Sequence, residues 1–491
     1  MVLFVGSMGF LSLLKKELIP SQDQSLFLLS LRTPIGTSLE VTDLLYQKAE
    51  AYLLKQPDIE DVYTTLGNYQ NNNVVNMGEI YVLLKDAKKR HLSQNHLMRQ
   101  MKLDLKRLLN SEEVYAQDLS LTGLSPSRGY PVEFTIEGTD WKKLVSYAQK
   151  MKRSLEERHI LEDMNSDFQP GMPEIQVIPD REKASLYGVS IAGLSQEVQA
   201  LIGGQVFNAN TQYTEDAHRY YIRMRSELKD VASLQDLKSL KLPNNRGISG
   251  DLVSIGKVAH FVLHETPQLI SRINRFRAIA MYANVNEKFS QRDALQEVLK
   301  MSQILNEPEV KVKLAGTAQA FEDAFDGLIF ALILGVVVAY MVLASQFNSF
   351  VHPITVLMAL PFSLSGAFFA LYLTGQSLSL FSMIGLILLM GIVKKNAILL
   401  VDFTNQKREE GLACIPALLE ACPVRLRPIL MTSIATIAGA IPASLSLGPG
   451  AENRIPMAIA LMGGVTISTF LTLFVIPCVY SLFSHWERPD F

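Results

Sequence analysis

The feature that most constrains this chain is a pair of adjacent lysines inside a segment long enough to cross a membrane. Residues 378–401 are otherwise apolar, and they contain most of the stretch MGIVKKNAILLVDF, with Lys394 and Lys395 at its centre. A charged side chain at such depth costs about 2.5–3.5 kcal/mol on membrane-insertion scales, so it is rare and usually functional. We therefore look in the surrounding sequence for a function that requires two such charges.

Apolar segments with the length of a membrane span lie on both sides of the lysine pair. Short, turn-rich links such as TGQS and SLGPGAENR separate some of them, so neighbouring helices must run antiparallel. Gly366 with Ala370, and Gly463 with Gly464, supply small residues at which helices can approach closely. The sequence predicts a bundle of five membrane helices at about 327–344, 354–373, 378–401, 428–447 and 456–483.

Basic residues set the orientation of this bundle. The link 402–427 carries Lys407, Arg408, Arg425 and Arg427, whereas the other short links carry only Arg454. The positive-inside rule places the basic link in the cytoplasm. The large region upstream then lies outside the cytoplasm, which is the periplasm in a cell with two membranes. Within the basic link, the stretch IPALLEA is amphipathic and predicts a helix on the membrane surface.

The upstream region alternates strands and helices. A strand at 27–31 precedes a helix that we expect Thr37 to cap, with Glu40 completing a capping box. Strands near 62–65 and 80–84, a helix from Ser93 and a strand near 116–121 follow. The order β-α-β-β-α-β is that of the ferredoxin-like fold.

The same order is expected to recur. A strand at 132–136, a helix capped by Thr139 and strands near 160–166 and 174–179 precede a long insertion, and the helix 290–305 follows it. The predicted fold class is an α+β membrane protein with two ferredoxin-like subdomains, an inserted subdomain and a five-helix bundle. The predicted boundaries are 1–16 (end of a truncated membrane helix), 17–128 (first subdomain), 129–185 and 268–324 (second subdomain), 186–267 (insertion) and 325–491 (membrane helices).

Composition excludes several classes of function. The formal net charge is −2, and no basic stripe with interleaved aromatic residues is found, which argues against nucleic acid as a partner. No nucleophile–base motif, phosphate loop or metal-spaced His/Cys cluster is found, so an enzyme is not expected. A buried cation in a helix bundle, attached to a large extramembrane region, indicates an ion-coupled transporter instead.

Four long motifs in the sequence resemble those of a known transporter family. The chain resembles the C-terminal half of a resistance–nodulation–division permease, closest in wording to its drug-exporting hydrophobe/amphiphile branch. The resemblance covers essentially the whole chain. It is carried by MGIVKKNAILLVDF, LRPILMTSIATIAGAIPASLSLGPGAENR, LASQFNSFVHP and REKASLYGVSIAGLSQEV.

The resemblance implies a multi-pass protein of the bacterial inner membrane with a large periplasmic domain. It implies a proton/drug antiporter that is driven by the proton motive force, without a cofactor. The implied substrates are hydrophobic or amphiphilic small molecules. The implied partners are an N-terminal half of the permease, further copies in a homotrimer, a periplasmic adaptor (membrane fusion) protein and an outer-membrane channel.

The resemblance also assigns a proton relay. The family's lysine before Asn-Ala-Ile-Leu falls on Lys395, its arginine beginning Arg-Leu-Arg-Pro falls on Arg425, and a threonine seven residues later falls on Thr432. The family pairs these cations with two aspartates in its fourth span, which this sequence does not contain. The relay is therefore expected to be incomplete in this chain. Lys394 departs from the family, which usually has a small polar residue at that place.

The family's substrate pocket is lined by aromatic side chains. Matching positions are Tyr63 and Tyr81 in the first subdomain and Phe134 in the second. The glycine-rich switch loop corresponds to about residues 67–73, where Tyr69 compensates for an aromatic residue that the family has at position 68. Its predicted residues are Gly67, Asn68, Gln70 and Asn71.

Two alternatives remain open at the level of the sequence. One is a membrane-anchored periplasmic binding or assembly module, or a gene remnant, that does not transport. The other is a metal-exporting branch of the same family, which needs methionine pairs or carboxylates along the substrate path.

The topology yields a first test in a background in which Cys414, Cys422 and Cys478 are serine. An impermeant thiol reagent added to intact spheroplasts should label Asn72→Cys and leave Gly411→Cys unlabelled, because the basic link containing Gly411 is expected in the cytoplasm. The reverse labelling pattern would overturn the orientation.

Overall fold

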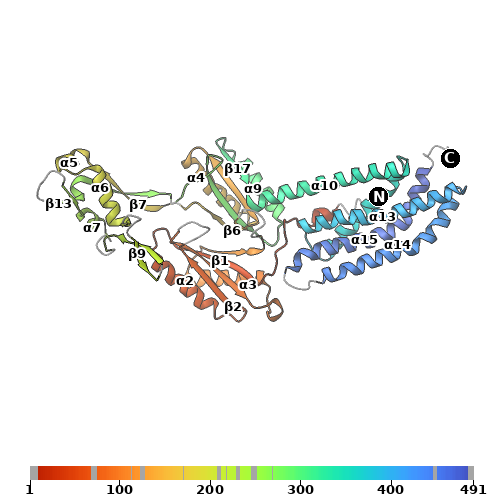
Figure 1. The fold of residues 1–491 in the computed structure, drawn as a ribbon, viewed down its shortest axis with the longest axis horizontal. Helices are drawn as coiled ribbons and strands as arrows, with labels where there is room; N and C mark the ends of the chain where they lie inside the picture. The colour runs from red at the N-terminus through yellow and green to blue at the C-terminus, as the bar shows by residue number, and fades with distance from the viewer. Residues whose placement is uncertain are drawn as a thin grey trace. The chain divides into compact units, whose positions relative to one another are not determined.

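The computed structural model describes residues 9–67, 74–111, 113–121, 128–169, 171–206, 212–216, 218–227, 233–244, 252–267, 269–445 and 450–484. The chain divides into two compact units, of which residues 169–268 form one and the remaining residues form the other. The larger unit contains two antiparallel sheets and the long apolar helices (Figure 1).

The first sheet has the strand order β2-β3-β1-β4. Its α2 and α3 contact each other, and both pack on the sheet. Phe27, Leu29, Ile80, Met101 and Leu105 are among the buried side chains between these layers. Each element lies within a few residues of its expected place; the bounds are β1 Leu26–Arg32, α2 Leu39–Leu53, β2 Ile59–Leu66, β3 Met77–Leu84, α3 Gln94–Leu109 and β4 Val114–Asp118.

Both expected helix caps are displaced by one residue. Ser38 caps α2, since its side chain accepts a hydrogen bond from the Val41 amide, whereas the Thr37 hydroxyl donates to the Pro34 carbonyl. Asp140, not Thr139, caps the first helix of the second sheet. In each case two neighbouring residues can act as caps, and the sequence pattern does not rank them.

The second sheet is built around β16, which pairs with β5 on one edge and with β15 and β6 on the other. On its far edge β5 pairs with β17. Helices α4 and α9 contact each other and pack on this sheet. The elements are β5 Val132–Gly138, α4 Trp141–Glu156, β6 Leu161–Ser166, β15 Ser271–Ile273, β16 Phe276–Val285, α9 Gln291–Leu305 and β17 Val310–Leu314.

The strand expected at 174–179 does not belong to this sheet. It is β7 (Met172–Pro179), and it pairs with β14 (Ala259–Thr266) inside the smaller unit. None of the residues of β7 is buried, whereas five residues of β16 are buried. The strand that joins the second sheet is therefore β16, the longer apolar strand that follows the insertion. The smaller unit therefore comprises residues 169–268, whereas the sequence predicts an insertion of residues 186–267.

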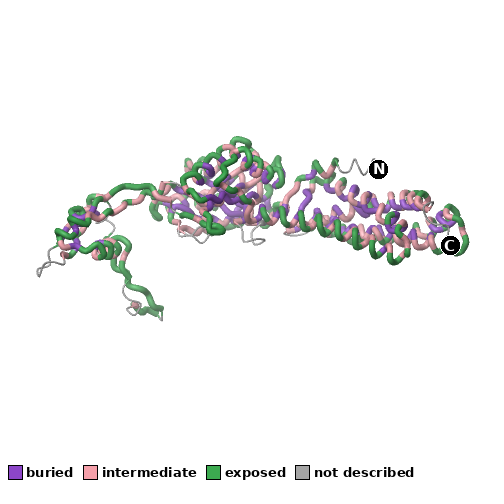
Figure 2. The backbone as a smooth tube through the Cα atoms, turned by 90° about the horizontal axis from the view of Figure 1, so that it is seen from above, coloured by how far each residue is buried: buried purple, intermediate pink, exposed green. Residues whose placement is uncertain are grey.

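The smaller unit has its own small core, which includes Ala184, Leu194, Leu242 and Val258. Most of its described residues are exposed or half-buried, as the green and pink tube shows (Figure 2). Between β7 and β14 its elements are α5 Arg181–Leu186, α6 Ile191–Val198, the π-helix Gln199–Gly204, β8 Gln205–Val206, β9 Gln212–Glu215, β10 His218–Tyr221, β11 Arg223–Met224, α7 Leu234–Ser239, β12 Lys241–Pro243, β13 Leu252–Ser254 and α8 Ile255–Val258.

Five helical segments in the described residues are long and apolar enough to cross a membrane, as expected. Small residues bring three of them together: a Cβ added at Gly366 of α12 would lie 2.6 Å from the Gly463 carbonyl oxygen of α15, and one added at Gly464 of α15 would collide with Leu389 of α13. The segments are α10 Gly316–Phe347, the successive α11 His352–Leu357 and α12 Ala359–Leu373, α13 Leu380–Glu409, α14 Cys414–Ser444 and α15 Arg454–Phe483.

The predicted surface helix IPALLEA is wrong. These residues form the first turns of the continuous helix α14, and the link from α13 shrinks to residues 410–413. Ala417, Leu418 and Ala421 are buried, which explains why this segment packs on the bundle. Lys407 contacts Glu410 at 2.8 Å and Glu420 at 3.0 Å, which joins the ends of the two helices.

Residues 15–19, which we name the strap, join α13 to the second sheet. The Leu378 amide donates to the Lys15 carbonyl at 2.8 Å, and the Leu380 amide donates to the Leu18 carbonyl at 3.0 Å. On the other side the Leu18 amide donates to Gln291 Oε1 at 2.7 Å. The amide Nε2 of Gln291 donates to the Pro131 carbonyl, also at 2.7 Å.

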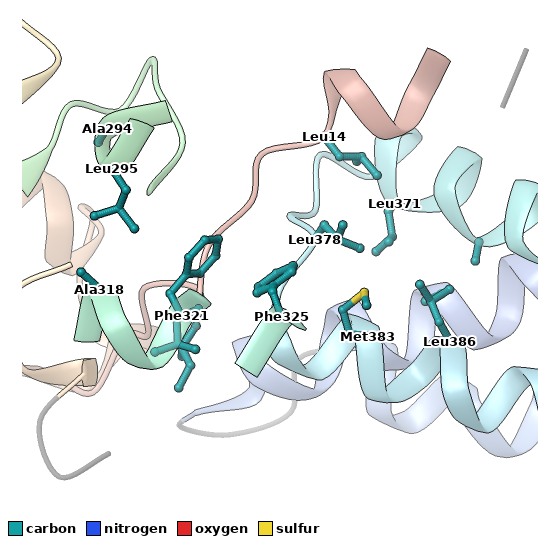
Figure 3. Packing of buried hydrophobic residues seen from close by; sticks show 14 of the residues in the cluster. Leu14, Ala294, Leu295, Ala318, Phe321, Phe325, Leu371, Leu378, Met383 and Leu386 are labelled. Carbon is teal, nitrogen blue, oxygen red and sulfur yellow. The ribbon is translucent and has the colours of Figure 1, made fainter. Parts of the chain in front are cut away.

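Apolar packing surrounds the strap. Leu14 and Leu378 belong to the same buried cluster as Phe321 and Phe325 of α10, whose ring centroids lie 4.5 Å apart. Figure 3 shows these side chains between Leu295 of α9 and the start of α13. The first turns of α10 thus reinforce the connection that the strap makes by hydrogen bonds.

Gln291→Leu tests the strap. Gln291 is 5 % exposed, and its loss leaves the Leu18 amide and the Pro131 carbonyl without their partner. A buried polar group left unpaired costs about 1–3 kcal/mol, so we expect a clearly lower melting temperature for the purified protein in detergent. Gln296→Leu, at an exposed position of the same helix, is the control and should change little. Equal melting temperatures for the two variants would contradict this role of Gln291.

Candidate functional site

One stripe of α13 is exposed among the residues that the structure describes. Ile384, Leu388, Gly391 and Lys395 are all exposed, and their spacing of three or four residues places them on one face of the helix. The opposite face packs on α12, α14 and α15. Helix α13 begins at Leu380 because Ser379 and Ser382 form a capping box. Lys395 thus stands about 15 residues inside the helix, roughly 22 Å along its axis, on its exposed stripe.

The two lysines line a groove of about 460 Å³ between α10 and α13. Gly335, Ala339 and Gly391 give it room, and the remaining lining residues are aliphatic. The groove lining contains no carboxylate, and neither lysine forms an ion pair with another described residue. Two ammonium groups in an apolar groove require an acidic partner from outside this set of residues.

Arg425 does not contact Lys395. Its guanidinium lies over the Phe403 ring at 4.6 Å, and Phe403 follows Lys395 on α13 by about two helical turns, roughly 12 Å. Its Nε atom is buried and has no hydrogen-bond partner among the described residues. The ring fixes the guanidinium by a cation–π contact, while part of its hydrogen-bonding capacity stays unused.

Thr432 also stays apart from the lysine. Its hydroxyl donates to the Ile429 carbonyl at 3.2 Å, which is the common arrangement of a threonine within its own helix. The structure therefore places the three predicted relay residues on two adjacent helices, without a direct contact between them among the residues described. Their assignment to a relay stays a prediction.

The sequence analysis missed a polar cluster that lies beside these residues. Ser433 accepts a hydrogen bond from Thr469 at 2.8 Å and one from Asn396 at 3.4 Å, which joins α13, α14 and α15. Asn396 is 7 % exposed, and its Oδ1 has no partner among the described residues. Polar side chains commonly connect membrane helices in this way, and an asparagine next to Lys395 in an apolar run was the available signal.

The predicted aromatic residues fall into two groups. Tyr63 of β2 and Tyr81 of β3 are direct cross-strand partners, with ring centroids 6.1 Å apart, and Tyr63 is 66 % exposed. Phe134 is 0 % exposed inside the core of the second sheet, and its role as a substrate contact stays a prediction. All seven residues of β5 are buried.

The expected switch loop lies mostly outside the described residues, as do Asn68, Tyr69, Gln70 and Asn71. Gly67 is described, and its φ of +76° is a conformation that suits glycine at the end of β2. Glu79, which the sequence analysis did not single out, lies on the same face as Tyr81. The Tyr81 hydroxyl donates to Glu79 Oε2 at 3.1 Å, and burial raises the pKa of the Glu79 carboxyl.

Solved structures share this fold. One, described as a heavy metal efflux pump in crystal form II, superposes with a TM-score of 0.86 at 23% identity over 99% of this chain and 50% of that chain. Crystal form I of a heavy metal efflux pump gives 0.85 at 23% identity, over 98% of this chain and 48% of that chain. The chain spans about half the length of these solved chains, and the likeness at this identity concerns the fold.

A family model provides the assignment. The model described as the AcrB/AcrD/AcrF family matches residues 1–484, which is nearly the whole sequence. The match takes in both sheets, the inserted unit and all five apolar helices. The chain belongs to the AcrB/AcrD/AcrF family of resistance–nodulation–division permeases.

Proposed function

We propose that this chain is part of a proton-driven permease that exports hydrophobic and amphiphilic small molecules across the bacterial inner membrane. The observation that carries the proposal is Lys395, a cation within a membrane helix, on an exposed face of α13 and without an acidic partner among the described residues. A charge that is costly in the bilayer and still present usually belongs to an ion pathway. The family match supports the proposal.

The relay needs carboxylates that this chain does not place in the groove. A second polypeptide segment, the N-terminal half of a permease, would supply them against the exposed face of α13. Lys395 would then hold such a carboxylate ionised, and protonation of the carboxylate would release the pair. Arg425, with its unused Nε, would provide a second cation about two turns away.

The extramembrane parts fit the same proposal. The two sheets would be the ferredoxin-like porter subdomains on the periplasmic side, and the exposed pair Tyr63 and Tyr81 would contact substrate. Residues 169–268 would meet a periplasmic adaptor and the path to an outer-membrane channel. The working assembly would be a homotrimer. Substrate is moved rather than transformed, so no catalytic residue is required.

Metal export is the second candidate, because the solved chains with this fold are described as heavy metal efflux pumps. The described residues offer little support for it. They contain no group of three or more His, Cys, Asp or Glu side chains that could hold a metal ion. Met101 of α3, Met151 of α4, Met281 of β16 and Met301 of α9 are buried in hydrophobic cores. Met98 of α3 instead lines a cavity of about 480 Å³ together with carboxylates that include Glu162 and Asp163. The exposed pair Tyr63 and Tyr81 is the observation that keeps organic substrates as the first candidate.

Two adjacent substitutions test the proposal in the assembled permease, with the N-terminal half co-expressed. Lys395→Met should abolish energy-dependent export, because an unpaired carboxylate in low dielectric favours its protonated form and fixes the relay in one state. Lys394→Met should be tolerated, since adjacent side chains project about 100° apart and only one can face the same partner. The measurements are dye accumulation, resistance to organic compounds and to metal salts, and membrane abundance of both variants.

Each contrary outcome has a definite meaning. Normal export by Lys395→Met together with failure of Lys394→Met would reverse the assignment of the two lysines. Loss of both variants from the membrane would show that the lysines are structural and remove the support for a relay. Resistance to metal salts without export of organic compounds would favour the second candidate.

A further inference from the structure

The sheet face that carries Tyr63 and Tyr81 also carries a carboxylate without a cationic partner. Glu79 lies two residues before Tyr81 on β3, so both side chains stand on the same face of the sheet. Glu79 is half-buried, and no lysine, arginine or histidine among the described residues forms an ion pair with it. Its single hydrogen bond comes from the Tyr81 hydroxyl, at 3.1 Å.

The neighbours of Glu79 do not neutralise it. Ser30 on β1 and Thr65 on β2 are its cross-strand partners, and both are uncharged. Arg32 stands two residues beyond Ser30 on the same face, but it is held by Glu113 at 3.5 Å and by the sulfur of Met77 at 3.3 Å. The carboxylate is thus partly withdrawn from water without the compensation that a nearby cation provides.

The two tyrosine rings complete the surroundings of this carboxylate. Their planes are tilted by 45° with centroids 6.1 Å apart, so they are not stacked on each other. An aromatic face attracts a cation within about 6 Å, and it also packs against the apolar body of an organic molecule. A carboxylate beside two such rings matches a ligand that combines a positive charge with an aromatic or aliphatic body.

We propose that Glu79, Tyr81 and Tyr63 form a subsite that selects organic cations, with the Glu79 carboxylate facing the positive charge and the rings contacting the apolar part. The inference rests on the proposed function and names the substrate class that this face prefers. A metal ion is a poorer occupant, because a single carboxylate supplies too few ligands for one.

The test compares two molecules of similar shape that differ in charge: tetraphenylphosphonium, a permanent cation, and triphenylphosphine oxide, which is uncharged. Binding of each radiolabelled compound to the purified full chain is measured by equilibrium dialysis, with empty detergent micelles as the blank. Glu79→Gln should weaken binding of tetraphenylphosphonium about tenfold and leave triphenylphosphine oxide unchanged, because only the cation loses a charge-assisted contact.

Two further variants control for charge and for folding. Glu60→Gln removes an exposed carboxylate from the neighbouring strand β2 and should leave the binding of both compounds unchanged. Glu79→Asp keeps the charge and should retain most of the binding of the cation. All variants should show the melting temperature of the unchanged chain, because Glu79 accepts only one hydrogen bond from the described residues.

The outcomes separate the inference from the proposed function. If Glu79→Gln binds tetraphenylphosphonium as tightly as the unchanged chain does, the inference is overturned and the proposed function stands. If the unchanged chain binds neither compound, the proposed substrate contact at Tyr63 and Tyr81 fails, and the inference fails with it. If Glu60→Gln weakens binding as much as Glu79→Gln does, general surface charge explains the effect and the subsite is rejected.

Discussion

The strap of residues 15–19 is the connection on which the larger unit depends, since it hydrogen-bonds to α13 and to α9 at the same time. Leu378 and Leu380 contact one side of it, and Gln291 contacts the other. These bonds run largely through backbone groups, which cannot adjust as freely as a long side chain. A movement of α13 along its axis therefore displaces Gln291 and the edge of the second sheet, unless the bonds break. The helix that carries Lys395 is mechanically joined to the extramembrane part by a short segment with few degrees of freedom.

The helical bundle has more polar groups than its own residues satisfy. Lys395 lacks an acidic partner, Arg425 leaves Nε unpaired, and Asn396 leaves Oδ1 unpaired among the described residues. Ser433 and Thr469 satisfy part of this demand by joining α13 to α14 and α15. The unsatisfied groups lie along α13 and at its contact with α14, which is where a complementary polypeptide would have the largest effect on stability and on charge.

Sequence reasoning succeeded where the signal was long or local. The five apolar helices follow from long hydrophobic runs, and the strands and helices of the first sheet follow from local alternation and periodicity. It failed where tertiary packing decides between equivalent local patterns. Strand β7 has the pattern of a strand, but nothing in its own residues names β14 as its partner.

The burial of Phe134 is likewise a matter of tertiary packing that the pattern of its own strand does not reveal. Alternation along a strand predicts one covered and one open face, whereas β5 lies between β16 and β17 and is buried at all seven positions.

The stretch IPALLEA differs from its prediction for another reason. Its pattern is amphipathic, but the segment continues into the long helix α14, with Ala417 and Leu418 buried against the bundle and Ile415 and Leu419 exposed.

Lys395 and Glu79 are both charges without a counter-charge among the described residues, and their surroundings set different demands on the partner. A cation within the bilayer costs about 2.5–3.5 kcal/mol, so a partner that stays beside it in the membrane is favoured. An aspartate or glutamate side chain on a neighbouring helix would be such a partner. Glu79 is only half-buried on an open sheet face, so water can replace a departing ligand at modest cost. An exchangeable partner therefore costs less at Glu79 than at Lys395, which agrees with the proposed substrate contact at the first and the proposed relay at the second.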